Sequence, residues 1–227
     1  MDSSIKHRLE AVRSRMSTAA VRAGRKPEEI KLVAVSKTHS AQSVAELVGM
    51  GQLCFGENRV QEAEDKITLI HGAEWHLIGH LQSNKARRAV KLFDVIQSVD
   101  SLELAERLER ICSEEGRSEL PIYIQVDLAQ ETTKTGMLAE KLPEAVKTIK
   151  DFHHLKLEGL MTIPPFFDDP EKVRPYFARL RHLRDEFVPN GGLSMGMSGD
   201  FETAIEEGST LIRVGTSIFG VRDYEKE

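Results

Sequence analysis

The chain has 227 residues, 40% of them hydrophobic and 30% charged, so it can bury a sizeable core, and we expect one domain spanning residues 1–227. Its 31 basic and 36 acidic residues are intermixed and leave a net charge of −5, which excludes the concentrated positive charge of a nucleic-acid or membrane-surface binder. No run approaches the roughly 20 apolar residues of a membrane span, so we expect a cytoplasmic protein with a small-molecule ligand. Cys54 and Cys112 are too few and too far apart for a disulfide framework or a metal cluster, and both are predicted to be packed thiols.

The N-terminal segment is predicted to be a helix that begins at Ser3 or Ser4 and ends at Gly24. Its apolar residues recur at the three- and four-residue spacing of one helix face. This helix precedes the first predicted strand and lies outside the regular alternation of strands and helices that follows it.

The first strand is predicted over residues 32–35, a continuous apolar run typical of a parallel strand covered on both faces. Lys37 follows at its carboxyl end, and Ser40 is placed to cap the next helix. An amine at such a strand end is partly desolvated yet reachable, which suits a Schiff-base nucleophile. A solvated surface lysine is the ordinary alternative.

The order of strand and helix repeats along the rest of the chain. Further strands are predicted at residues 53–55, residues 75–78, FDVIQSVD, residues 122–126, LKLEGLMTIPP, LSMGMSGD and residues 211–214. Helix caps are predicted at Asn58 with Gln61, at Ser83 or Asn84, at Asp100 with Glu103, and at Asp169 before Pro170. Eight such units predict an α/β fold, a single (β/α)8 TIM barrel with an extra N-terminal helix, and a doubly wound sheet is the alternative.

In a barrel, the polar residues at the carboxyl ends of the strands converge on one mouth, where barrel enzymes keep their chemistry. The residues so placed are Lys37, Asn58, His80, Asp127, Met161, Ser198, Arg213, Gly215 and Thr216. Several have simpler interpretations, because Asn58 fits a helix cap, His80 can bond a neighbouring carbonyl group and Met161 fits a core position.

The last two strands carry the more informative pattern. Ser198 and the pair Gly215-Thr216 follow strands seven and eight, where barrels commonly hold phosphate. Together with Lys37 they suggest a phosphate and an aldehyde held at opposite sides of one mouth, as pyridoxal 5′-phosphate (PLP) requires. Arg213 lies two residues before Gly215, so it is expected to point inward and face the ring nitrogen.

Six blocks of the sequence, in order, resemble the PLP homeostasis (YggS) family. They are AVSKTHS, FGENRVQE, WHLIGHLQSNK, the run Ser98–Ser101, GLMTIPP and LSMGMSGDFETAIEEGSTLIRVGTSIFG. The resemblance covers essentially the whole chain. It implies a PLP-binding protein of vitamin B6 and amino-acid homeostasis, similar to the N-terminal barrel of alanine racemase but without that enzyme's second, β-rich domain.

The resemblance also implies a role for each site residue. Lys37 carries the Schiff base, Ser198, Gly215 and Thr216 hold the phosphate, Arg213 meets the pyridine nitrogen, and Asn58, His80 and Met161 lie near the ring. It implies no metal ligand and no established catalytic residue.

Arg213 bears on whether bound PLP would be catalytic. Arginine offers only donors and stays charged, so a ring nitrogen facing it stays unprotonated and stabilises a carbanion poorly. Among PLP reactions, racemisation is the one least affected by the loss of this stabilisation. It needs acid/base groups on both faces of the Schiff base, and in alanine racemases a tyrosine supplied with the second domain serves one face. None of Tyr123, Tyr176 and Tyr224 is placed for that role.

We therefore expect a carrier or regulator that holds PLP as a reversible Schiff base, with amino acids as further candidate ligands. A PLP-dependent amino-acid racemase is the alternative, and a barrel enzyme acting on a phosphorylated metabolite without PLP is a third. A monomer is expected, with a weak dimer as the alternative state.

Overall fold

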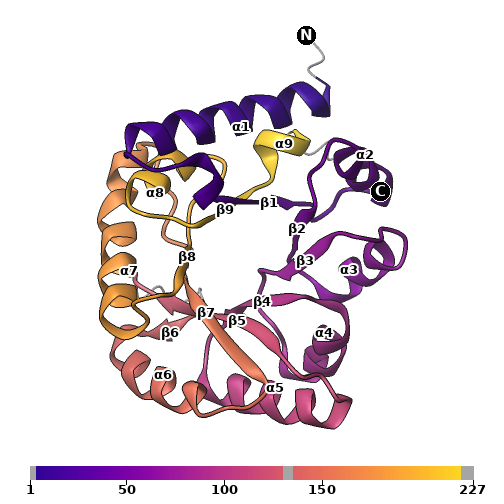
Figure 1. Ribbon diagram of the computed structural model, residues 1–227, viewed down its shortest axis with the longest axis vertical. Helices are drawn as coiled ribbons and strands as arrows, with labels where there is room; N and C mark the ends of the chain where they lie inside the picture. Colours follow the sequence, from indigo (N-terminus) through magenta and orange to yellow (C-terminus); the bar gives the residue numbers. More distant parts are fainter. Residues whose placement is uncertain (1–3, 130–134, 221–227) are drawn as a thin grey trace.

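A ring of parallel strands forms the centre of the molecule in the computed structural model, which describes residues 4–129 and 135–220 (Figure 1). The strands of the ring are β1 (Lys31–Val35), β2 (Cys54–Glu57), β3 (Glu74–Leu77), β4 (Val95–Val99), β5 (Leu120–Asp127), β7 (Leu155–Met161), β8 (Gly192–Ser194) and β9 (Leu211–Val214). Strand β1 pairs with both β2 and β9, and the pairing of β4 with β5 closes the ring. The closed parallel barrel confirms the predicted TIM barrel, and the doubly wound alternative is wrong.

Helices surround the barrel and alternate with its strands. They are α1 (Ile5–Arg22), α2 (Ala41–Gly49), α3 (Val60–Ile67), α4 (Ala86–Leu92), α5 (Leu102–Glu115), α6 (Leu142–Lys150), α7 (Arg174–Phe187), α8 (Phe201–Glu206) and α9 (Thr216–Phe219). Short 3₁₀ turns lie at Pro27–Glu29, Ser83–Lys85, Ala139–Lys141 and Pro170–Val173, and β6 (Met137–Leu138) pairs with the end of β5. No helix in the described part of the chain is long and apolar enough to cross a membrane.

The main hydrophobic core lies between the strands and the helices. Phe55 and Trp75, on neighbouring strands, are both buried there with their ring centroids 5.4 Å apart. Because side chains alternate across a strand, the residues directly before and after Phe55 and Trp75 on each strand face the barrel interior. Val33, Cys54 and Leu211 form a separate small apolar cluster. The barrel interior also buries polar side chains, namely His76, Gln97, Ser194 and Arg213.

Three of the predicted helix starts are confirmed by hydrogen bonds. The side chain of Ser4 accepts from the backbone N–H of His7 at the start of α1. Ser40 accepts from the N–H of Ser43 at the start of α2, and Asp169 accepts from the N–H of Glu171 in the turn that precedes α7. Each satisfies a donor that has no partner within its own helix.

Three predicted caps are wrong. Ser83 and Asn84 lie inside the 3₁₀ turn before α4, and the N-caps of that turn and of α4 are Gln82 and Lys85, neither with a side-chain cap. Helix α3 has Arg59 at its N-cap, without a side-chain cap, and Asn58 is turned to the barrel mouth. At α5 the capping oxygen comes from Ser101, which accepts from the N–H of Leu104, whereas the Asp100 carboxylate lies 2.9 Å from His80 Nδ1. At α3 and α5 the residue that follows the predicted cap takes the N-cap position. The predicted residue instead lies at the barrel mouth, where Asn58 lines the pocket and Asp100 contacts His80.

The extra helix α1 packs across α8 and α9 (Figure 1). Arg8 of α1 donates from Nε to the carbonyl oxygen of Ile218 at 2.7 Å and from Nη2 to that of Phe219 at 3.2 Å. Helix α1 therefore holds α9, the four-residue helix that follows Gly215.

Candidate functional site

A pocket of about 460 Å³ opens at the carboxyl ends of the strands. Of the nine residues predicted at the mouth, Asp127 at the end of β5 does not line the pocket, and seven do, namely Lys37, Asn58, His80, Ser198, Arg213, Gly215 and Thr216. Met161, at the end of β7, is wholly buried and does not line it. The sequence interpretation missed other lining residues, including His39, Gln125, Phe166, Phe167 and Asp200, since most of them lie in loops whose course no periodicity predicts.

The turn that carries Lys37 begins at a buried hydrogen-bond network. Ser36 donates from Oγ to Glu57 Oε1 at 2.6 Å. Lys66 of α3 donates to the carbonyl oxygen of Ser36 and to Glu57 Oε1, both at 2.7 Å. Burial raises the pKa of Glu57, and the hydrogen bonds from Lys66 and Ser36 oppose that shift. The backbone on the strand side of Lys37 is thereby tied to β2 and α3.

The turn is also held on the other side of Lys37. Thr38 has φ 66°, the left-handed region that a β-branched residue rarely adopts. Its backbone N–H donates to Glu62, which also accepts from Lys66 Nζ at 2.9 Å. Lys66 therefore holds the backbone on both sides of Lys37, the residue predicted to carry the cofactor.

Arg213 lies inside the barrel beneath the pocket and is 3% exposed. Its Nη1 donates to Ser194 Oγ at 2.5 Å and its Nη2 to the carbonyl oxygen of Thr162 at 2.8 Å. Nε makes no hydrogen bond to any described residue, and Nη1 and Nη2 each keep a second N–H, so the guanidinium has donors left for a ligand. Burial lowers the pKa of Arg213 to about 10, against the opposing charge of Asp200, so the guanidinium remains charged at neutral pH.

The loops after β8 and β9 meet at the pocket. Ser217 donates its backbone N–H to Ser198 Oγ at 3.3 Å, which joins the two loops. A Cβ on Gly215 would lie 3.3 Å from the carbonyl oxygen of Val35, so glycine allows this close approach to β1. Within α9 the N–H groups of Ile218 and Phe219 donate to the carbonyl oxygen of Gly215. The N–H of Thr216 makes no hydrogen bond to a described residue, so it suits an anion at the start of the helix.

Acidic and aromatic groups complete the rim. Asp200 accepts from the backbone N–H of Met197 at 2.6 Å, and burial raises the pKa of its carboxyl group. His39 stacks on Phe219 with the ring centroids 4.4 Å apart. His80 Nδ1 lies beside the Asp100 carboxylate, so that carboxylate orients the imidazole ring and favours a proton on Nδ1.

The comparison with known proteins gives one consistent result. Residues 5–223 match the family described as alanine racemase, N-terminal domain. The pyridoxal phosphate homeostasis protein of Escherichia coli K12 is 41% identical over 235 residues, covering 98% of this chain and 99% of that protein. The chain belongs to the pyridoxal phosphate homeostasis protein family.

Other members of the pyridoxal phosphate homeostasis family agree with this assignment. The protein of that name from Aquifex aeolicus is 41% identical, covering 96% of this chain and 98% of that protein. PipY of Synechococcus elongatus PCC7942, solved with PLP bound, is 40% identical with a TM-score of 0.78, covering 91% of this chain and 99% of that chain.

Alanine racemases share the fold at lower similarity. The enzyme of Clostridium difficile 630 has a TM-score of 0.73 and 17% identity, and the alignment covers 97% of this chain but 57% of that chain. This likeness shows the common barrel alone, and the racemase alternative is not favoured.

Proposed function

We propose that this protein binds PLP in the mouth pocket through Lys37 and acts as a carrier or regulator of PLP in vitamin B6 and amino-acid homeostasis. The observation that carries the proposal is that an amine, a charged donor and two glycine-bearing loops line one pocket of about 460 Å³, within the usual range for small-molecule sites. When bound, PLP supplies an aldehyde that condenses reversibly with a lysine amine as a Schiff base.

The residues of the pocket fit the parts of this cofactor. The Lys37 amine lies at the end of β1, while the loops of Ser198 and of Gly215 and Thr216 follow β8 and β9. These loops offer hydroxyl and backbone donors for a phosphate dianion. Nε of Arg213, which has no partner among the described residues, is proposed to donate to the ring nitrogen. Asn58 and His80 line the same pocket and are proposed to contact the ring.

Met161 has a different proposed role. Its side chain is 0% exposed at the end of β7, and it is absent from the pocket lining. We propose that it supports the floor beneath the ring by packing alone.

A carrier role follows from what the pocket offers a bound substrate. Arginine donates but does not accept, so Arg213 leaves the ring nitrogen unprotonated and disfavours carbanion chemistry. No tyrosine lines the pocket in the described part of the chain: Tyr123 lines a cavity at the opposite end of the barrel, and Tyr176 packs against Phe167. Among the described residues, which do not include Tyr224, the pocket thus lacks the phenol that serves one face in a racemase.

The deciding experiment locates the Schiff base. The purified protein loaded with PLP is reduced with borohydride, digested and mapped by mass spectrometry. We expect the pyridoxyl group on Lys37 and loss of the near-ultraviolet cofactor band in Lys37→Ala, with Lys85→Ala as the matched control. A major adduct on Lys85 or Lys134, the latter outside the described residues, would disprove the assignment.

The alternatives are separated by two further measurements. A barrel that bound a phosphorylated metabolite without PLP would show no cofactor band to lose. Incubation of the loaded protein with single amino-acid enantiomers, followed by chiral analysis, tests racemisation and amino-acid binding. We expect no interconversion.

The finer expectations on assembly and location belong to the same proposal. We propose a cytoplasmic monomer in which one chain supplies the amine, the ring contacts and the phosphate donors. Sedimentation of the PLP-loaded protein at micromolar concentration tests this, and a stable dimer would overturn it.

A further inference from the structure

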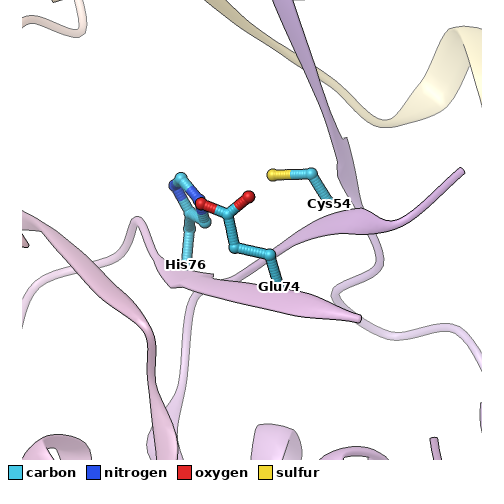
Figure 2. Close-up of side chains that lie close together, drawn as sticks. All are labelled: Cys54, Glu74 and His76. Atoms are coloured by element: carbon cyan, nitrogen blue, oxygen red, sulfur yellow. The ribbon is translucent and has the colours of Figure 1, made fainter. Parts of the chain in front are cut away.

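A second cluster of reactive side chains lies at the amino-terminal ends of the strands, opposite the mouth pocket. Cys54 and Glu74 are the first residues of β2 and β3 and lie side by side in register. His76 follows two residues after Glu74, so it faces the same side of the strand. The thiol, a carboxylate oxygen and an imidazole nitrogen all lie within 4.8 Å of one another, with the Glu74 carboxylate between the other two groups (Figure 2).

These three groups are ordered by their neighbours. Glu74 lies 2.9 Å from His76 Nε2 and accepts from Lys31 Nζ at 2.9 and 3.0 Å. These contacts, that with His76 foremost, lower the pKa of Glu74 to about 2, so its carboxylate is ionised at neutral pH. Cys54 is 7% exposed, and its sulfur makes no hydrogen bond to a residue in the described ranges.

We propose that Cys54, Glu74 and His76 form a binding site for a divalent metal ion of the zinc class. Sulfur, nitrogen and oxygen donors in one set suit a borderline ion such as Zn²⁺, whereas Mg²⁺ and Ca²⁺ prefer oxygen ligands alone. Three protein ligands leave one tetrahedral position for water or an exogenous ligand. A cavity of about 240 Å³, lined by Glu74 and His76 and also by Tyr123 and Glu158, adjoins the cluster and gives access to that position.

Lys31 is the cation that the metal ion has to replace. Its ammonium group neutralises Glu74, and its side chain is 50% exposed, so it can turn into solvent without leaving a buried charge behind. Binding also displaces the proton of the Cys54 thiol, because only the thiolate is a good ligand. Removing the Lys31 amine should therefore strengthen metal binding, which no purely structural role of the cluster would produce.

Gln97 lies beside the second ring nitrogen of His76, where a metal-binding histidine needs a hydrogen-bond acceptor. Its Nδ1 lies 2.6 Å from the side-chain amide of Gln97, whose oxygen accepts from Ser194 Oγ at 2.6 Å. A metal ion on Nε2 requires the proton on Nδ1, so the Gln97 amide has to turn and present its oxygen to that proton. Gln97 is then a positioning residue that orients the imidazole toward the metal ion.

The test is a titration of the full-length protein with Co²⁺, followed by displacement with Zn²⁺. We expect one tightly bound Co²⁺ per chain, with the visible spectrum of a four-coordinate ion and a sulfur-to-cobalt charge-transfer band. Cys54→Ser should abolish that band, and His76→Gln should weaken binding by more than the roughly 10- to 100-fold cost of losing an outer partner. Lys31→Met should bind more tightly than the parent.

The matched controls are Cys112→Ser, a buried thiol on α5 outside this cluster, and His71→Gln, an exposed histidine. Both should bind Co²⁺ as the parent does. Circular dichroism checks the folding of each variant, and Glu74→Gln provides a second ligand variant if Cys54→Ser does not fold. A charge-transfer band that survives in folded Cys54→Ser, or no stoichiometric binding by either the parent or Lys31→Met, would overturn the proposal.

Discussion

Arg213 donates a hydrogen bond of 2.5 Å to the hydroxyl group of Ser194 inside the barrel, and Ser194 in turn donates to Gln97. The bond holds the guanidinium with its Nη1 edge toward β8 and leaves Nε without a described partner. An arginine fixed in this way presents its remaining N–H donors in one orientation. This rigidity makes the effect of replacing Arg213 predictable.

Replacing Arg213 with glutamate should raise the reactivity of bound PLP. A carboxylate can accept a hydrogen bond from a protonated ring nitrogen and so stabilise the pyridinium, which restores the electron sink that arginine suppresses. We expect the folded, loaded Arg213→Glu variant to exchange the Cα proton of an added amino acid for deuterium faster than the parent. The measurement is mass spectrometry of the amino acid.

The matched control is Arg213→Met, which also removes the buried cation but offers no acceptor. Both variants should lose stability, because Ser194 Oγ and the carbonyl oxygen of Thr162 lose a buried donor, which costs about 1–3 kcal/mol for each group left unsatisfied. Equal exchange in Arg213→Glu, Arg213→Met and the parent would show that the ring nitrogen does not limit the chemistry.

The phosphate is expected to supply much of the affinity for PLP. Charge-assisted hydrogen bonds from the loops of Ser198 and Thr216 are worth about 1.5–3 kcal/mol each. Pyridoxal, which lacks the phosphate, should therefore bind far more weakly than PLP when both are titrated by absorbance. Equal affinity for the two compounds would rule out the proposed phosphate site.

Arg8 should affect PLP binding without touching the cofactor. Its bonds to Ile218 and Phe219 hold α9, whose first residue is Thr216. We expect Arg8→Ala to weaken PLP binding by roughly tenfold, or about 1.4 kcal/mol, while pyridoxal binding stays unchanged.

The control for Arg8 comes from the same helix. Arg15 pairs with Glu202 and lies over the Phe201 ring, so it contacts α8 but not α9. Arg15→Ala should leave the ratio of PLP to pyridoxal affinity at its parental value. A fall in both affinities for Arg8→Ala would indicate a general loss of structure instead.

Lys66 should contribute strongly to stability because it pairs with a carboxylate that has no exposed surface. Lys66→Met leaves Glu57 buried without its cation, which typically costs about 3–5 kcal/mol. Urea unfolding of the parent and the variant measures the difference. Lys91→Met, which removes a lysine paired with Glu115 at the surface, should change stability little.

The loss in Lys66→Met should depend on pH. Burial already raises the pKa of Glu57, and removing Lys66 raises it further. A carboxyl group whose pKa is raised on folding contributes stability below its unfolded pKa of about 4.3 and loses it as pH rises through the folded value. The deficit of Lys66→Met should therefore be smaller at pH 5 than at pH 8. The double variant with Glu57→Gln should show no such difference.

Ser101, and not the adjacent Asp100, caps the start of α5. Ser101 accepts from the N–H of Leu104, so Ser101→Ala should destabilise the protein by about 1 kcal/mol. Ser113→Ala, near the other end of the same helix, is the control and should have a smaller effect. If the two serine variants were equally stable, the assigned cap would be wrong.

The order and type of the main elements could be predicted from local pattern. Apolar runs and helical spacing mark the barrel strands and most helices, and Ser4, Ser40 and Asp169 cap where the pattern places them. Because parallel strands of a barrel end at one mouth, Lys37 and Arg213 could be assigned to the same pocket without coordinates. These features depend on residues close together in the chain, or on one rule that all the strands obey.

The tertiary structure decided what depends on register and on competition between neighbours. Asn58 or Arg59, and Asp100 or Ser101, can each precede a helix, and only packing at the mouth chooses between them. Cys54 appeared to be an isolated thiol, since its sequence neighbours carry no metal-ligand spacing. The pairing of β2 with β3 places it beside Glu74 and His76, about twenty residues away. Sequence spacing carries the period of a strand but not the register between strands, because that register is set by how the whole barrel closes.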